Sequence, residues 1–325
     1  MRKRTRYSLF IVLALVAALI AAIWLRKHAP PEVARLLPES DAIVYVNFRA
    51  VRLASHFDRT PVSRSPDYQH FIDATGIDPE RDLDAAAFAL HRMDDPRGPN
   101  GPVGYSEVFE GTFDGARLAR YLASIASSQE EYAGHIIYTI PIEGRQFRIA
   151  QLAYDTIAAS NMPTTEQIHS ILDRYRAGAS PFSGSSLLSA RYRDVPLLST
   201  AWAIGHIGLP FSDRGYITLF GLQLPLPEDT AFVASLRYVG SLHLRIEEIA
   251  PTEADAQKAA QSLTALLELF RSLQKMQPRN ANDSAFLQMI GTLKIERSKD
   301  RAVLTATIPT ELLKQITARP AEAQP

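Results

Sequence analysis

Four acidic side chains stand at alternate positions near residue 80, a spacing that could place several carboxylates around a calcium ion: Asp78, Glu80, Asp82 and Asp84. A calcium loop of the EF-hand type also needs glycine at its sixth position and glutamate at its twelfth, where this chain has Leu83 and Ala89. Pro79 and Arg81 between the acids favour the other interpretation, a helix-to-strand turn with solvated side chains. We therefore expect no metal and no cofactor here.

Other catalytic signatures are missing from the sequence. The eight histidines are spread out, with no two of them two or four residues apart, and the absence of cysteine excludes thiolate catalysis, Cys-based zinc sites and disulfides. No Gly-x-Ser-x-Gly elbow and no phosphate-binding glycine loop occurs. The serine-rich residues 183–186 could hide a nucleophile, but such a run is also typical of an interdomain loop. Glu247 and Glu248 should point to opposite faces of a strand, so they cannot act as a catalytic pair. We expect no catalytic residues.

Residues 197–207 form the most distinctive predicted strand. Alternation predicts one face with large or polar side chains, namely Leu198, Thr200, Trp202, Ile204 and His206. The other face would carry only small residues, namely Ser199, Ala201, Ala203 and Gly205. Such a row lets another group approach the sheet closely, either a packed helix or a ligand. If a ligand binds, Trp202 and His206 are the candidate ligand-binding residues.

An apolar run from Tyr7 to Leu25 precedes the rest of the chain and has about the length that a helix needs to cross a bilayer. Its anchor residues include Leu9, Phe10, Leu13, Leu19 and Trp24. A cleaved leader would have a shorter core followed by small residues, whereas Arg26 and Lys27 follow here. A retained anchor is therefore favoured over a cleaved leader or a buried core helix.

Charge gives the orientation of this anchor. Four cations precede the run and two follow it, which predicts a cytoplasmic N-terminus and a periplasmic body on a single-pass protein of the inner (cytoplasmic) membrane. The first 27 residues hold six of the 35 Lys and Arg residues and no acid, so the remainder has 29 cations against 35 acids, a net charge of −6. An acidic body argues against a nucleic-acid partner.

The pattern of apolar residues predicts an α+β fold: a single N-terminal transmembrane helix, then an ectodomain of largely antiparallel sheets with helices packed on one face. Asp114 and Thr164 should cap helices, and residues 252–275 form the most regular amphipathic helix. Element order suggests a duplicated unit. The predicted organisation is a basic tip and anchor (1–27), a linker (28–40), two α+β halves (41–178 and 195–317) and a disordered tail (318–325).

Three short segments resemble uncharacterised bacterial exported proteins that are anchored by one membrane helix. They are Leu-Pro-Glu-Ser-Asp-Ala at 37–42, Thr-Gly-Ile-Asp at 75–78 with Asp-Leu-Asp at 82–84, and Ile-Pro-Thr-Glu-Leu-Leu at 308–313. The resemblance implies an N-terminal transmembrane helix and a repeated α+β body. It carries no catalytic residue over to this chain.

These observations predict a non-enzymatic structural or binding role in the cell envelope, with an envelope protein, a lipid or a glycan as partner. The alternative is an envelope hydrolase whose site is assembled only in three dimensions. A third interpretation makes helix 252–275 a partner face, although its apolar stripe is wide enough to be covered by its own sheet.

Overall fold

A computed structural model describes most of the chain after the first 28 residues. The described ranges are 29–55, 64–98, 100–178, 183–206, 216–219, 222–225, 230–276 and 284–309. The predicted anchor, with Leu9, Phe10, Leu13, Leu19 and Trp24, and the predicted tail 318–325 lie outside them. None of the helices in the described ranges is both long and apolar enough to cross a membrane.

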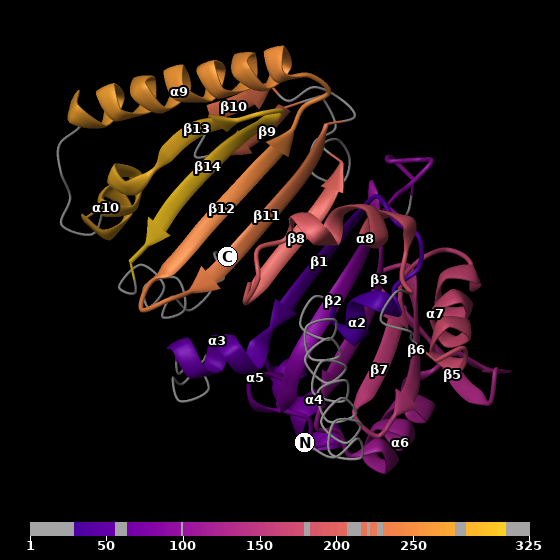
Figure 1. The fold of residues 1–325 in the computed structure, drawn as a ribbon. Helices are drawn as coiled ribbons and strands as arrows, with labels where there is room; N and C mark the ends of the chain where they lie inside the picture. The colour runs from indigo at the N-terminus through magenta and orange to yellow at the C-terminus, as the bar shows by residue number, and fades with distance from the viewer. Residues whose placement is uncertain are drawn as a thin grey trace, which may run out of the picture.

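Twelve strands form one large sheet in which every neighbouring pair is antiparallel (Figure 1). They are β1 (Ala42–Asn47), β2 (Leu83–Arg92), β3 (Val103–Gly111), β4 (Ser128–Tyr132), β5 (His135–Ile142), β6 (Arg145–Ala153), β7 (Thr156–Ser160), β8 (Ala201–His206), β11 (Ala231–Tyr238), β12 (Leu242–Ile249), β13 (Lys294–Ser298) and β14 (Arg301–Ile308). A separate pair consists of β9 (Tyr216–Leu219) and β10 (Leu222–Pro225). The predicted α+β class with largely antiparallel pairing is confirmed.

Helices connect these strands and pack against the sheet. They are α2 (Glu32–Arg35), α3 (Phe48–Ser55), α4 (Pro66–Thr75), α5 (Pro79–Asp82), α6 (Gly115–Ile125), α7 (Glu166–Arg176), α8 (Ser186–Arg191), the 3-10 turn η2 (Tyr192–Asp194), α9 (Glu253–Met276) and α10 (Ser284–Thr292). α9 confirms the predicted long helix and packs along β13 and β14. Asp114 caps α6 as predicted, its carboxylate accepting from the Arg117 N–H at 3.0 Å. The cap predicted at Thr164 is wrong, because Thr165 is the N-cap of α7 and its side chain makes no capping bond.

Strands from the two predicted halves meet where β1 pairs with β8. Outward from β1 the order is β2, β3, β7, β6, β5 and β4; outward from β8 it is β11, β12, β14 and β13. On each side the second and third strands form a hairpin, a helix follows later in the chain, and a later hairpin (β6–β7 or β13–β14) lies outside them with its later strand nearer the centre. Among the described strands, β4 and β5 have no counterpart on the β8 side. At the join Val44 pairs with Ala203, and the neighbours in this row are Phe88 beside Val44 and Ala234 beside Ala203.

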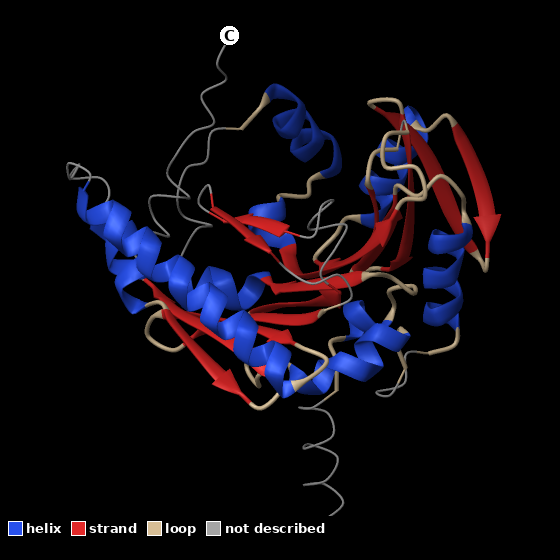
Figure 2. Cartoon of the chain, turned by 90° about the horizontal axis from the view of Figure 1, so that it is seen from above, coloured by secondary structure: helices blue, strands red, loops and turns tan. Residues whose placement is uncertain are grey.

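Helices lie on both sides of the sheet (Figure 2), which corrects the prediction that they pack on one face. Ala158 of β7 belongs to the core formed with α2, α7 and α8, whereas its neighbour Ile157 belongs to a second core with α4 and α6. Successive strand residues point to opposite faces. Both faces of these outer strands are apolar, so each face needs its own covering helices.

Candidate functional site

Trp202, a predicted ligand-binding residue, belongs to the core. Its side chain is 3% exposed, stacks on Tyr45 with ring centroids 5.4 Å apart, and meets Tyr192 edge-on at 5.4 Å. Burial, with help from Glu110 and Tyr192, raises the pKa of Tyr45 to about 12. A residue enclosed by two other aromatic side chains has no surface left for a ligand.

His206, the other predicted ligand-binding residue, lies exposed at the end of β8. Its backbone N–H donates to the Asp41 carbonyl. His206 is four positions beyond Trp202 in the strand, so their Cα atoms are about 13 Å apart. The structure therefore does not bring the predicted pair together. The strand is also shorter than predicted, because residues 195–200 turn, with Leu198 at φ 63° and 89% exposed.

Acidic side chains near residue 80 are engaged in the fold. Asp78 caps α5, and its own N–H donates to the Asp82 carboxylate at 2.7 Å. Asp84 is bound by Arg49 and Arg52. No cluster of His, Cys, Asp and Glu able to hold a metal occurs within the described ranges. The turn interpretation is therefore the one that the contacts support.

The serine-rich run is also structural. Ser185 caps α8 by accepting from the Leu188 N–H, and the Ser186 hydroxyl donates to the Glu39 carboxylate at 2.6 Å. The run thus fixes the start of a short helix to the linker before β1.

Two serine–histidine pairs among the described residues have the contact that a nucleophile and its base would need. Ser241 Oγ lies 3.0 Å from His243 Nε2, only two residues along the chain, and both side chains are half buried. The other pair is buried. His91 Nε2 lies 2.9 Å from the Ser106 hydroxyl, which in turn lies 3.2 Å from the Ser160 hydroxyl. The side chains of His91, Ser106 and Ser160 are 5%, 0% and 1% exposed. Burial lowers the pKa of His91 to about 4, so the ring is neutral and a weak base. A substrate carbonyl cannot reach Ser106 in this arrangement.

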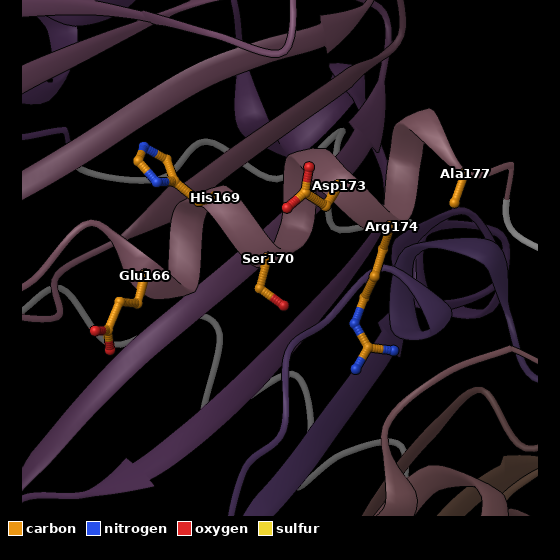
Figure 3. A pocket seen from close by; sticks show the side chains of 6 residues that line it. All are labelled: Glu166, His169, Ser170, Asp173, Arg174 and Ala177. Atoms are coloured by element: carbon orange, nitrogen blue, oxygen red, sulfur yellow. The ribbon is translucent and has the colours of Figure 1, made fainter.

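A hollow of about 500 Å³ runs along the outer surface of α7 (Figure 3). Five of the six residues that line it lie in this helix and the sixth is its C-cap: Glu166, His169, Ser170, Asp173, Arg174 and Ala177. The His169 ring stacks on Tyr132 with centroids 3.7 Å apart, and the Tyr132 hydroxyl donates to Asp173 at 2.9 Å. These polar groups therefore hold β4 against α7. With a single wall, the hollow does not enclose a ligand.

The two faces of the central strands differ in burial. The face toward α2 and α8 is fully buried. Ala42 and Ala86 on the opposite face, which we call the half-buried face, are also fully buried, but most of the other side chains there are apolar and only partly covered. In the middle strands they are small or medium-sized: Val44, Val46, Ala201, Ala203 and Ala234. On either side they are larger: Phe88, Leu90 and Phe109 on β2 and β3, and Phe232, Leu236, Leu244 and Ile246 on β11 and β12.

Register places these residues in rows across the sheet. One row runs from Glu107 through Phe88, Val44, Ala203 and Ala234 to Ile246, and the next from Leu90 through Ala42, Gly205 and Phe232 to Glu248. The small residues predicted for one face of residues 197–207 therefore lie in the middle of an apolar surface. A contiguous apolar surface that is only partly covered is typical of a binding site.

Two carboxyl side chains lie on this face, and the sequence prediction missed both as site residues. Burial raises the pKa of Glu107 to about 7, and it also raises the pKa of Glu248, which is 6% exposed. Neither carboxyl has a hydrogen-bond or ion-pair partner among the described residues. The sequence did contain one signal for Glu107. It lies between Tyr105 and Phe109 in the alternation of β3, at a position where an apolar side chain is expected.

Glu247 and Glu248 point to opposite faces, as predicted. Glu247 lies on the buried face, where Arg245 and Arg301 bind its two oxygens at 2.6 and 2.8 Å. Arg301 also binds Asp194 at 2.8 Å. Beside this paired carboxylate, the unpaired Glu248 is an exception that needs an explanation.

No family model matches the chain, and no curated protein matches it. Solved structures of TP0453 are similar to it in outline. Crystal forms I, III and IV share 12%, 12% and 11% sequence identity, cover 89%, 89% and 88% of this chain and 98%, 99% and 96% of their own, and have TM-scores of 0.46, 0.49 and 0.48. Likeness at these values carries no information about what the chain does.

Proposed function

We propose that this chain is a membrane-anchored extracytoplasmic protein that binds rather than catalyses, and that its half-buried face binds the hydrocarbon chains of a lipid. The observation that carries the proposal is the contrast between the two faces of the central strands. Both are apolar, but only one is fully covered by the chain's own helices. The sequence supports the anchor through the uncharged run at residues 7–25 and its flanking cations.

The chemistry of the face favours a hydrocarbon over the other predicted partners. β1 pairs with both β2 and β8, and β8 pairs with both β1 and β11, so the backbone there has no free donors or acceptors. A glycan or an extended peptide would lose hydrogen bonds to water and find no replacement. A hydrocarbon chain loses none. Burying on the order of 300 Å² of apolar surface would contribute about 7 kcal/mol before the costs of association.

The dimensions of the face also suit a lipid. From Phe88 on β2 to Phe232 on β11 there are three interstrand steps, about 14 Å, and a six-residue strand such as β1 is about 20 Å long. That area could hold the paired chains of one lipid or a single helix.

We also propose that the two halves are a duplicated α+β unit. The similar order of the first four strands on either side of the β1–β8 pair supports this. Binding would then use the join between the copies, where each contributes one side of the face.

Native mass spectrometry of the full-length chain extracted from membranes tests the lipid proposal. We expect a retained mass of a lipid in the wild type and its loss in Ala203→Phe, which fills the middle of the half-buried face. Ala116→Phe, on the exposed surface of α6, is the matched control and should retain the lipid. A wild type without lipid, or one that forms a stable dimer through this face, would overturn the proposal.

A reporter fusion tests the anchor independently. A reporter enzyme that is active only outside the cytoplasm should be active when fused after residue 40. Activity of a cytoplasm-specific reporter at the same position would reject the proposed orientation, without bearing on what the half-buried face binds.

A further inference from the structure

Glu248, which is buried, and Glu107, which is half buried, are unusual because neither carboxyl has a hydrogen-bond or ion-pair partner among the described residues. Other buried charged side chains have partners: Glu247 is bound by two arginines, and Arg148 donates to the carbonyls of Met162 and Pro163 at 2.6 and 3.1 Å. Glu248, which is 6% exposed, has no such partner among the described residues, and Glu107, which is half buried, has none either. A buried carboxylate without a partner is costly, and such groups tend to be found where a ligand supplies the missing partner.

Position connects both carboxyls to the surface proposed to bind lipid. Glu107 is directly opposite Phe88, and Glu248 is directly opposite Phe232, so each acid lies just outside the larger side chains on its side of the half-buried face. Five interstrand steps separate β3 from β12, about 24 Å along the sheet. A single headgroup can therefore reach only one of them. Each side of the face offers one carboxyl.

We propose that Glu107 and Glu248 are the polar contacts of the half-buried face, and that the amphiphile it takes carries a protonated amine. This inference rests on the proposed lipid-binding function. An ammonium group supplies the donors and the positive charge that each carboxylate lacks, and the ring of Phe88 or Phe232 beside it adds a favourable cation–π contact. A carboxylate or sulfate headgroup would meet a like charge, and a hydroxyl would supply a donor without the charge.

The ligand's charge would also remove the cost of keeping these carboxyls ionised. Burial raises the pKa of both carboxyls, that of Glu107 to about 7, so without a ligand the protonated form of each is more favoured than it would be in water. An ammonium beside either one favours its ionised form. The hydrocarbon part contributes affinity at Ala203 and its neighbours, and the carboxyl contributes selectivity for the headgroup.

Three amphiphiles of one chain length separate the headgroup from the hydrocarbon. Dodecylammonium, dodecanol and dodecanoate are each titrated calorimetrically into the full-length chain held in a non-ionic amphipol, with the amphipol alone as blank. We expect dodecylammonium to bind at least about tenfold more tightly than dodecanol, and dodecanoate to bind more weakly than dodecanol, because one charge-assisted hydrogen bond is worth roughly 1.5–3 kcal/mol.

Variants assign the preference to the two carboxyls. The double variant Glu107→Gln with Glu248→Gln should bind dodecylammonium and dodecanol within about twofold of each other, with its affinity for dodecanol unchanged. Each single variant should lose part of the preference. Glu131→Gln, on the exposed edge strand β4, is the matched control and should behave as wild type.

The outcomes distinguish this inference from the function on which it rests. If all three amphiphiles bind equally, or if the double variant keeps the preference for the amine, the face binds hydrocarbon but the role of the carboxyls is overturned. If none of the three binds, the lipid-binding function itself fails.

Discussion

Replacing Glu107 with glutamine should stabilise the protein at pH 8 and leave its stability nearly unchanged at pH 4.5. The carboxyl titrates at about 7 in the folded protein, against an ordinary value of 4.5, because it is desolvated. Between these two values the unfolded chain has released a proton that the folded chain still holds. Stability therefore falls as pH rises from 4.5 to 7, and the loss is complete above pH 7. Glutamine has nearly the same shape and no charge, so it removes the loss.

The magnitude follows from the pKa. A rise from 4.5 to about 7 corresponds to about 3 kcal/mol at 1.36 kcal/mol per pH unit. The side chain is half buried, and solvent screening lowers the expected gain to about 2 kcal/mol. For a sheet of this size, 2 kcal/mol raises the melting temperature by roughly 4 °C. Glu248 contributes to the wild type in the same direction, so the comparison must be made between variant and wild type at each pH.

Thermal unfolding of the full-length chain in a mild detergent, followed by circular dichroism, measures this difference. The melting temperature of Glu107→Gln should exceed that of the wild type at pH 8 and match it at pH 4.5, whereas Glu131→Gln should match the wild type at both. An equal gain at both pH values would show that the effect is unrelated to ionisation. A less stable variant at pH 8 would show that Glu107 has a partner that stabilises its charge, and would refute the reasoning.

Three further stability predictions follow from other buried groups, each measured by urea unfolding of the full-length chain. His91 has a pKa of about 4 in the folded protein against 6.5 unfolded, so the wild type should lose up to about 3 kcal/mol as pH falls from 6.5 to 4, and His91→Gln should lose less over that range. Arg301→Ala removes the cation shared by Glu247 and Asp194 and should lower the free energy of unfolding by roughly 3 kcal/mol. Equal stability of variant and wild type would contradict this shared role. Trp202→Ala should lower the free energy of unfolding by about 3–5 kcal/mol. Loss of lipid binding without loss of stability would instead support the ligand-binding role predicted for Trp202.

Local patterns predicted most of the individual elements. β-branched and aromatic residues identified β1, and a regular 3.6-residue period identified α9. Both signals depend only on residues that are close together in the sequence. The faces that the helices cover were not predictable in the same way. Ile157 and Ala158 are adjacent and both buried, and only the three-dimensional arrangement shows that they belong to different cores.

The candidate site was predicted only in part. The small face of β8 was recognised, and Trp202 and His206, on the other face of the strand, were named as the ligand-binding residues if a ligand binds. An exposed-looking tryptophan in a strand cannot be distinguished from a core tryptophan until Tyr45 and Tyr192 are seen against it. Glu107 and Glu248 were missed because their burial depends partly on strands that are distant in sequence: β3 lies against β7 as well as its hairpin partner β2, and β12 against β14 as well as its hairpin partner β11.

The small residues at the join of the two halves do not all have the same cause. A Cβ atom at Gly205 would lie 2.7 Å from the Cβ of Ala42, so glycine is needed there simply to let β8 approach β1. Ala201 and Ala203, on the same face of β8, are half buried. Strand packing therefore explains Gly205, whereas the proposed hydrocarbon would lie against the two alanines. β8 alone supplies these alanines, whereas the aromatic side chains flanking them come from both halves. The half-buried face proposed to bind lipid therefore exists only when the twelve strands form one sheet.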